Sequence, residues 1–269
     1  METENVYLKP ITLKNIMKFA LPTIAMSLFM AFYTMVDGLF VSNLIGTNAL
    51  SAINLSAPII SLVTAISTML ATALVTGITT LMFNWTMLRY VGENGIAAIT
   101  IIMYVLMFVS SLFSGYSYGV APMISYYYGE QNHEKLKKLI CKSLKIIAVI
   151  SVLSLAASLI ITKPLVSIFA RPDNPVFELA VTGNRICSIA LLFIGFNIFS
   201  SGMFTALNNG IVSAILAFSR SFVFMVICLL ALPLFFGVTG IWLATPAAEL
   251  MAIALACFMF LKYKNKYKF

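Results

Sequence analysis

Charged residues are scarce in this sequence. Only 10% of its 269 residues are Asp, Glu, Lys or Arg, whereas soluble domains carry about a quarter. Hydrophobic residues make up 61% of the chain, and the mean hydropathy is +1.00. The apolar residues form continuous runs of about 20 residues, which favours membrane-spanning helices over a transmembrane β-barrel. The sequence therefore predicts an all-α polytopic membrane protein with no room for a separate soluble domain.

Patterns that would indicate catalysis or metal binding are also missing. The four cysteines show no ligand spacing, so we expect them to pack without disulfide or metal; they are Cys141, Cys187, Cys228 and Cys257. No nucleophile with a nearby base and no phosphate-binding loop is visible. The stretch GYSYG from Gly115 is too sparse for such a loop and lies within an apolar run. We expect neither an enzyme nor a bound cofactor.

Positive charge exceeds negative charge, with a formal net charge of +8. The Lys and Arg residues lie in short runs beside apolar segments, where they act as topology signals and contact anionic lipid. We therefore expect the partner of the basic groups to be the lipid bilayer, and no nucleic acid.

Apolar runs and helix breakers predict the positions of most helices. The expected ranges are 15–42, 95–127, 143–162, 178–207, 211–236 and 239–261. The stretch 49–91 is ambiguous, because one helix of that length would measure about 65 Å, roughly twice the hydrocarbon thickness. Two crossings with a turn within 68–77 give eight crossings in all, and a single tilted or kinked helix gives seven.

Lysine clusters give an independent test of the crossing number. Lysines are concentrated at 135–145 and 262–268, and Lys9, Lys14 and Lys18 precede the first apolar run. All three groups should be cytoplasmic, which requires an even number of crossings before residue 129 and favours eight. The first run is long and has no small-residue cleavage pattern, so we expect a retained first helix and both termini in the cytoplasm.

The chain is similar to itself at an offset of 46 residues. This offset pairs Gly46, Asn48, Ala52 and Ile53 with Gly92, Asn94, Ala98 and Ile99. Each copy is expected to end a helix at the glycine, form a short polar turn and begin a new helix with small residues. Internal repeats of this kind underlie many transporters. The first copy stops near Met69, whereas five further helices follow the second.

Four stretches of the chain carry a resemblance to a known family. They are LPTIAMSLFMAFYTMVDGLFVSNLIGTNALSAINLSAPI from Leu21, GITTLMFNWTMLRYVGENGIAAITII from Gly77, GVAPMISYYYGEQN from Gly119, and GVTGIWLATPAAE from Gly237. Their content and order resemble the multidrug and toxic compound extrusion (MATE) transporters, bacterial branch. The resemblance implies a secondary antiporter with two six-helix lobes and a central cavity that opens alternately to either side.

The same resemblance implies how the chain is divided. Residues 1–70 resemble a partial N-terminal lobe, with the first helix and part of the second, and residues 71–269 resemble a complete six-helix C-terminal lobe. Helices three to six of the family have no counterpart. A homodimer would restore a two-lobed cavity. A transport-inactive remnant, a membrane interaction protein or a lipid-linked oligosaccharide flippase of the same superfamily are the alternatives.

Asp37 is the first candidate for coupling transport to a cation gradient. It lies inside the first predicted helix, in the motif MVDGLF, and a carboxylate in a membrane helix is costly enough to suggest function. Its position matches the first-helix acid that the family uses for Na⁺ or H⁺ coupling. Binding of either cation would neutralise the charge and bias the helix toward one conformation. A carboxylate that reaches headgroup water is the structural alternative.

Glu249 is the second candidate, because it lies deep in the last predicted helix. Pro246 just upstream leaves a backbone carbonyl unpaired, as is common near transporter sites. Arg220, about ten residues into the preceding helix, could approach Glu249 by snorkelling. The pair could lock two helices together, or Glu249 could take part in coupling.

Several other side chains could contact a transported compound. Aromatic and thioether groups suit amphipathic organic cations, and amide or hydroxyl oxygens suit Na⁺ or polar substrate atoms, although such residues also pack between helices. The candidates are Phe32, Tyr33, Met35, Asn84, Asn197, Ser200 and Ser201. The sequence thus predicts a plasma-membrane antiporter that exports organic cations or amphipathic drugs, driven by Na⁺ or H⁺.

Overall fold

The structure is a computed structural model that describes residues 10–44, 46 and 70–268, and the regular elements among them are all helices. In chain order these are α1 (Leu13–Leu44), α3 (Leu70–Tyr90), α4 (Glu93–Gly129), α5 (His133–Phe169), α6 (Pro175–Cys187), the 3₁₀ turn η2 (Ser188–Ala190), α7 (Leu191–Ala206), α8 (Gly210–Phe218), the π-helical segment η3 (Ser219–Val223) and α9 (Phe224–Tyr267).

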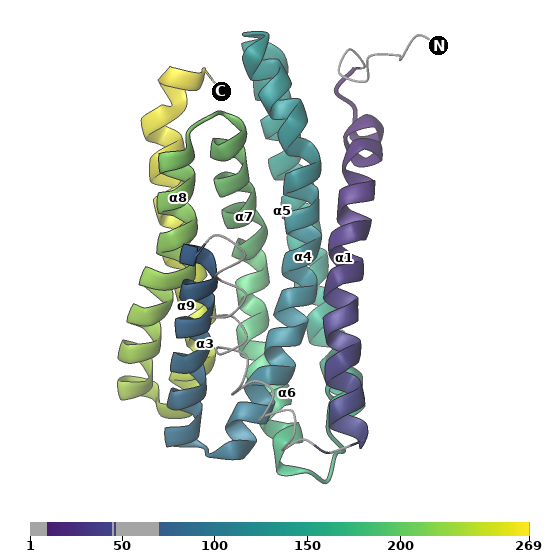
Figure 1. Ribbon diagram of the computed structural model, residues 1–269, viewed down its shortest axis with the longest axis vertical. Coiled ribbons are helices and arrows are strands. Elements are labelled where there is room, and N and C mark those ends of the chain that lie inside the picture. Colours follow the sequence, from purple (N-terminus) through teal and green to yellow (C-terminus); the bar gives the residue numbers. More distant parts are fainter. Residues whose placement is uncertain (1–9, 45, 47–69, 269) are drawn as a thin grey trace.

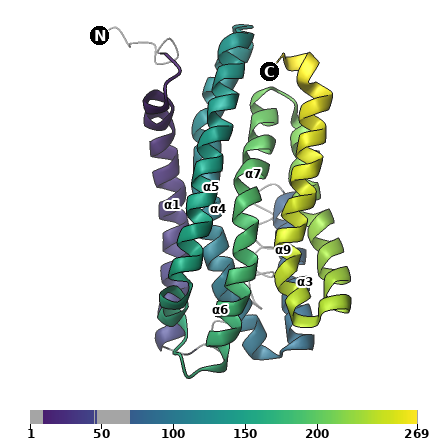
Figure 2. The ribbon, with the colours of Figure 1, turned by 180° about the vertical axis from the view of Figure 1, so that it is seen from behind.

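The helices form an elongated bundle with their axes roughly along its length (Figure 1). Viewed from either side, α1 lies at one edge of the bundle and α8 and α9 at the other, with α4, α5 and α7 between them (Figure 2). Within the described residues, five helical stretches are long and apolar enough to cross a membrane, namely Leu13–Leu44, Glu93–Gly129, His133–Phe169, Pro175–Ala206 and Gly210–Tyr267. The predicted all-α membrane architecture is therefore present.

The last of these stretches reverses direction at Gly237. This residue has φ 56° and ψ −133°, a conformation that a side chain would disfavour. The two arms then pack together: a Cβ added to Gly240 would collide with the backbone of Leu232, and Cys228 Sγ lies 3.9 Å from Met251 Sδ. The arms before and after Gly237 match the two helices predicted at 211–236 and 239–261.

Asparagine side chains fix where three helices begin. Asn132 accepts a hydrogen bond from the Lys135 amide, Asn174 from the Val176 amide, and Asn209 from the Val212 amide. Such N-caps satisfy amide groups that lack a partner in the first turn. The cap at Asn132 corrects one prediction, because α5 begins at His133 and not at 143. Its Lys-rich first turns are amphipathic, with apolar side chains such as Leu136 and Leu139 buried.

The glycines paired by the internal repeat have the same local structure. Gly46 has φ 111° and Gly92 has φ 86°. The Gly46 amide donates to the Val41 carbonyl over 3.2 Å, and the Gly92 amide donates to the Met87 carbonyl over the same distance. A bond to the carbonyl five residues earlier with a left-handed glycine is typical of helix ends. The expected helix stops at both glycines are therefore present.

The predicted turn within 68–77 is wrong for residues 70–77, which lie inside α3. This segment has no proline and no charge, and a single internal glycine, Gly77, costs a helix only about 1 kcal/mol. The rest of the ambiguous stretch falls on 47–69, outside the described residues, as does the polar turn that begins at Asn48.

Two glycines of α4 allow α1 to pack closely on it. A Cβ at Gly115 would lie 2.6 Å from Ile24 Cα, and a Cβ at Gly119 would lie 2.6 Å from Ala20 Cα. Glycines four residues apart on one helix face permit close backbone approach between membrane helices. The GYSYG stretch is therefore a helix-crossing motif, a role that was not predicted from the sequence.

Most lysines lie at one end of the bundle. Figure 1 shows that α1 begins, α4 passes into α5, and α9 ends at the same end. The lysines on these parts are Lys14, Lys18, Lys135, Lys137, Lys138, Lys142, Lys145, Lys262, Lys264, Lys266 and Lys268. α1 and α3 both end at the opposite end. The helices thus bring together lysine groups that are distant in sequence, as the charge pattern predicted.

Candidate functional site

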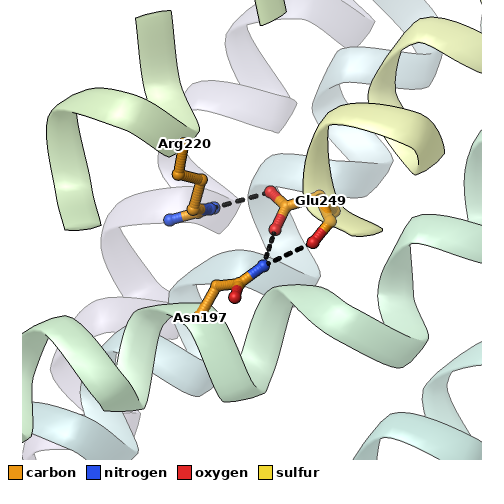
Figure 3. A network of polar contacts seen from close by, with 3 residues as sticks. All are labelled: Asn197, Arg220 and Glu249. Carbon is orange, nitrogen blue, oxygen red and sulfur yellow. Dashed lines mark hydrogen bonds and ion pairs between the residues drawn. The ribbon is translucent and has the colours of Figure 1, made fainter. Parts of the chain in front are cut away.

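Glu249 forms the centre of a buried polar network (Figure 3). Its side chain is buried, with Oε1 accepting from Arg220 Nε over 2.8 Å and Oε2 accepting from Asn197 Nδ2 over 2.6 Å. The same amide nitrogen also donates to the Glu249 carbonyl over 3.0 Å. Three separate elements, α7, η3 and α9, are thereby held to one carboxylate.

The backbone around this network departs from regular α-helix at two places. Arg220 lies in the π-helical turn η3, and π-turns inside helices are often found at functional sites. Pro246, three residues before Glu249, cannot donate to the Trp242 carbonyl. The Cys187 thiol donates to that carbonyl over 3.2 Å instead. A thiol from α6 therefore satisfies the group that Pro246 leaves unpaired beside the site.

Two cavities adjoin the network. One, of about 250 Å³, is lined from α3, α4, α7, η3 and α9 and includes both Arg220 and Glu249. The other, of about 440 Å³, is lined from α4, α7, α8 and η3 and includes Arg220 and Asn197. Ser110 and Ser221 line both. Arg220 thus lies where the two cavities meet.

The 440 Å³ cavity, which we call the hydroxyl cavity, is rich in side-chain hydroxyl groups. These belong to Ser110, Ser114, Ser117, Tyr118, Ser201, Thr205 and Ser221. Asn197 Oδ1 is buried and has no hydrogen-bond partner within the described part of the chain. The orientation of this amide is fixed, because its nitrogen faces two acceptors of Glu249, and Figure 3 shows the oxygen on the other side.

Asp37 does not belong to this network. It is exposed on α1, close enough to Tyr104 for an electrostatic interaction. α1 packs mainly against α4, with a smaller contact to α5. Asp37 and Glu249 therefore lie in different parts of the bundle, and the structure does not bring the two predicted coupling acids together.

The predicted aromatic and thioether candidates lie in two different settings. Phe32 and Met35 line a third, almost wholly apolar cavity of about 340 Å³ between α1, α4 and α5. Phe108 faces them from α4. Tyr33, which we predicted beside them, is exposed on α1 and does not line this cavity.

The predicted polar candidates separate into two groups. Asn197 and Ser201 line the hydroxyl cavity, where Ser201 also bonds to Ser213. Ser200 is buried and donates to the Phe196 carbonyl of its own helix, and Asn84 is buried on α3. Neither of these two lines the cavities described above. Their positions support packing roles.

The serines of α4 were not among the site residues predicted from the sequence. Ser110, Ser114 and Ser117 lie at spacings of four and three residues, which places them on one helix face. That periodicity is visible in the sequence, but the helices that face it are not.

Among the described residues no three His, Cys, Asp or Glu side chains come together as a metal site.

Comparison with known proteins decides the family. The sequence model of the MatE family matches residues 78–231, more than half of the chain. The chain belongs to the MATE family. This is a family of transporters and not of enzymes, in agreement with the absence of catalytic motifs from the sequence.

Individual relatives share only low sequence identity with this chain. The multidrug export protein MepA of Staphylococcus haemolyticus is 27% identical over 190 residues, which cover 71% of this chain and 41% of MepA. A solved outward-facing multidrug resistance transporter of the MATE family and MOP superfamily superposes with a TM-score of 0.68 at 20% identity. A MOP superfamily transporter from Pyrococcus furiosus gives the same TM-score and identity. Each superposition covers 74% of this chain and 45% of the solved chain. The chain thus spans less than half the length of these relatives, with which it shares a fold.

Proposed function

We propose that this MATE-family chain is part of a secondary antiporter that exports amphipathic organic compounds, organic cations among them, in exchange for Na⁺ or H⁺. The observation that carries the proposal is the buried Glu249 carboxylate, held by Arg220 and Asn197 where two cavities meet. A carboxylate inside a membrane bundle is expensive and marks ion or substrate pathways in transporters.

In this proposal, coupling depends on Glu249 exchanging its partner Arg220 for a cation. Glu249 is bound to Arg220 in the described state. A proton or Na⁺ on Glu249 would weaken that pair and release η3 from α9, so that cation binding favours a second arrangement of the two helices. Asp37 would offer a second cation site on α1, where its exposed carboxylate makes no ion pair with any residue that the structure describes.

The apolar cavity between α1, α4 and α5 supports export of amphipathic compounds. Phe32, Met35 and Phe108 line it. Aromatic faces and thioethers adapt to ligands of different shape and attract organic cations. We assign the apolar part of a transported compound to this cavity.

The orientation and lobe arrangement are part of the proposal. The Lys-rich end would face the cytoplasm of a bacterium, because lysines accumulate on the cytoplasmic side of the plasma membrane. Residues 71–269 would form one six-helix lobe, made by α3, α4, α5, α6 with α7, and the two arms that meet at Gly237. Residues 1–70 would belong to the other lobe, and a second copy of the chain would complete the two-lobed cavity.

Transport in reconstituted vesicles tests this function. Vesicles with the purified chain and an imposed H⁺ or Na⁺ gradient are loaded with a fluorescent organic cation, and efflux is compared for wild type, Glu249→Gln and Asp37→Asn. The matched control is Glu178→Gln, which makes the same change at an exposed carboxylate in the first turn of α6. We expect gradient-driven efflux to fall in the first two variants and to persist in the control.

One efflux result would contradict the proposed function. Efflux that does not depend on the gradient and is unchanged by Glu249→Gln and Asp37→Asn would reject the antiporter. It would favour an interaction protein of the membrane. Chemical cross-linking of the same vesicles tests the second copy, since a monomer that transports at full rate would exclude the homodimer.

A further inference from the structure

A further cavity, which we call the basic cavity, lies at the Lys-rich end of the bundle, where α1 begins beside the first turns of α5 (Figure 1). Its volume is about 300 Å³. The described residues that line it are Pro10, Ile11, Asn132, Glu134, Lys135 and Lys138. A cavity at the end of a bundle of membrane-spanning helices lies at the depth of the lipid headgroups, outside the hydrocarbon core.

Both walls of the basic cavity are held by hydrogen bonds of their own. On one side, the Ile11 carbonyl accepts from Lys142 Nζ, and the Ile11 side chain is buried in the core. Asn15 Nδ2 donates to the Pro10 carbonyl over 2.8 Å. On the other side, the Asn132 cap fixes the first turn of α5. The space between the two walls is therefore a feature of the fold.

Positive charge dominates this cavity. Lys135, Lys138 and Lys142 follow one another at spacings of three and four residues, which places them on one face of α5, the face that contacts the segment before α1. Lys135 Nζ lies 5.7 Å from the centroid of the Tyr127 ring. Neither Lys135 nor Lys138 forms an ion pair within the described part of the chain. Glu134 supplies the one carboxylate among the described lining residues, so the cavity favours an anion.

The surroundings of the basic cavity favour an anion with an apolar part. α1 lies at the edge of the bundle in both views (Figures 1 and 2). Within its first three turns it exposes the side chains of Leu13 and Leu21. A soluble anion would make no use of this surface, whereas the acyl chains of a lipid would cover it. Basic pockets between membrane helices are known to bind the headgroups of anionic lipids.

We propose that the basic cavity binds one anionic phospholipid, with its phosphodiester at Lys135 and Lys138. Charge-assisted hydrogen bonds from the two ammonium groups hold the phosphate, and the remaining space takes a small uncharged headgroup such as glycerol. A choline headgroup would bring a positive charge toward the same lysines. The proposal differs from general attraction of lysines to a membrane surface, because it assigns one lipid to two particular lysines. It does not depend on the proposed antiport.

Lipid binding to the purified full-length chain in uncharged detergent tests the proposal. Titration with phosphatidylglycerol or phosphatidylcholine, followed by native mass spectrometry, gives the affinity for the first bound lipid. We expect phosphatidylglycerol to bind at least about tenfold more tightly. The double variant Lys135→Gln, Lys138→Gln should lose this preference. The matched control is Lys137→Gln, Lys145→Gln, which removes the same charge from exposed positions of the same helix that do not line the cavity.

A second variant should strengthen binding, so that its effect cannot come from misfolding. Glu134→Gln removes the carboxylate of the lining and should tighten phosphatidylglycerol binding by about fivefold, the effect of one charge near a membrane surface. Glu130→Gln is its control, because Glu130 is exposed in the turn before α5 and does not line the cavity.

Three results would overturn the proposal. The first is equal affinity for phosphatidylglycerol and phosphatidylcholine. The second is an equal loss of affinity in the two double lysine variants together with equal effects of Glu134→Gln and Glu130→Gln, which would show general attraction alone. The third is displacement of phosphatidylglycerol by an equal concentration of glycerol 3-phosphate, which would show that a soluble phosphate compound occupies the cavity.

Discussion

The close crossing of α1 and α4 makes a quantitative prediction for Gly119→Ala. A Cβ at this position would lie 2.6 Å from Ala20 Cα and 2.9 Å from Ala20 Cβ. Carbon atoms in contact prefer separations of about 3.5–4.0 Å, so α1 must move away by about 1 Å. The obstacle is backbone, which cannot rotate aside as a side chain can. Overpacking of this kind costs about 1–3 kcal/mol.

The matched control is Gly129→Ala at the end of α4. A Cβ there meets nothing within 4 Å. Alanine is favoured over glycine within a helix by up to about 1 kcal/mol, and this gain applies to both variants. Gly119→Ala should therefore be less stable than Gly129→Ala by about 1–3 kcal/mol, with the difference arising from the crossing alone.

Unfolding of the purified chain in mixed micelles, titrated with denaturing detergent, measures this difference. Limited proteolysis of the same samples reports whether α1 separates from the bundle before the other helices unfold. Equal unfolding free energies for Gly119→Ala and Gly129→Ala would refute the assignment of GYSYG as a packing motif, and so would unchanged protection of α1.

Three further predictions concern the polar site and the topology. Arg220→Gln should destabilise the chain by about 3–5 kcal/mol, because it leaves the Glu249 charge buried without a counter-ion, and the double variant Arg220→Gln, Glu249→Gln should recover most of the loss in the same unfolding titration. Cys187→Ala should cost about 1–3 kcal/mol, since the Trp242 carbonyl then has no donor. This cost should shrink in a Pro246→Ala background, where the residue-246 amide can donate, and an equal cost in both backgrounds would contradict the assignment. Cysteines introduced at Gln131 and Asp173, exposed in turns at opposite ends of the bundle, should differ in labelling by an impermeant reagent added to intact cells. Asp173→Cys should react and Gln131→Cys should not, and the reverse pattern would show that the Lys-rich end faces outward.

Helices and their ends were predictable from the sequence where the signal is local. The apolar runs predicted the end of α7 near Ala206 and the division of the last apolar stretch near Gly237. The glycines of the internal repeat predicted the helix ends at Gly46 and Gly92. The exception at α5 is also local. The Lys-rich segment before residue 143 was left outside the predicted helix, but an Asn132 cap and buried Leu136 extend the helix through it.

Features that depend on which helices are neighbours could not be predicted. Arg220 and Glu249 lie on consecutive predicted helices, so their contact could be proposed from the sequence. The hydrogen bond of Asn197 to Glu249 requires α7 to face α9, which the sequence does not show. The same holds for GYSYG, whose two glycines have meaning only once α1 is placed against them. The π-turn around Arg220 was not predicted from the sequence. Periodicity identifies a helix face but not its partner.

One short segment of α4 connects the two predicted coupling acids. Gly115 and Gly119 hold α1, the helix of Asp37, while Ser117 between them packs against Gly202 of α7, the helix that carries Asn197 to Glu249. α1 packs mainly on α4, so its displacement at the crossing must be accommodated by this segment. If the two acids act in one transport cycle, Gly119→Ala should change the cation dependence of efflux although it touches neither carboxylate. If they act independently, that variant should lower stability and leave the cation dependence of the Glu249 site as it is in the wild type.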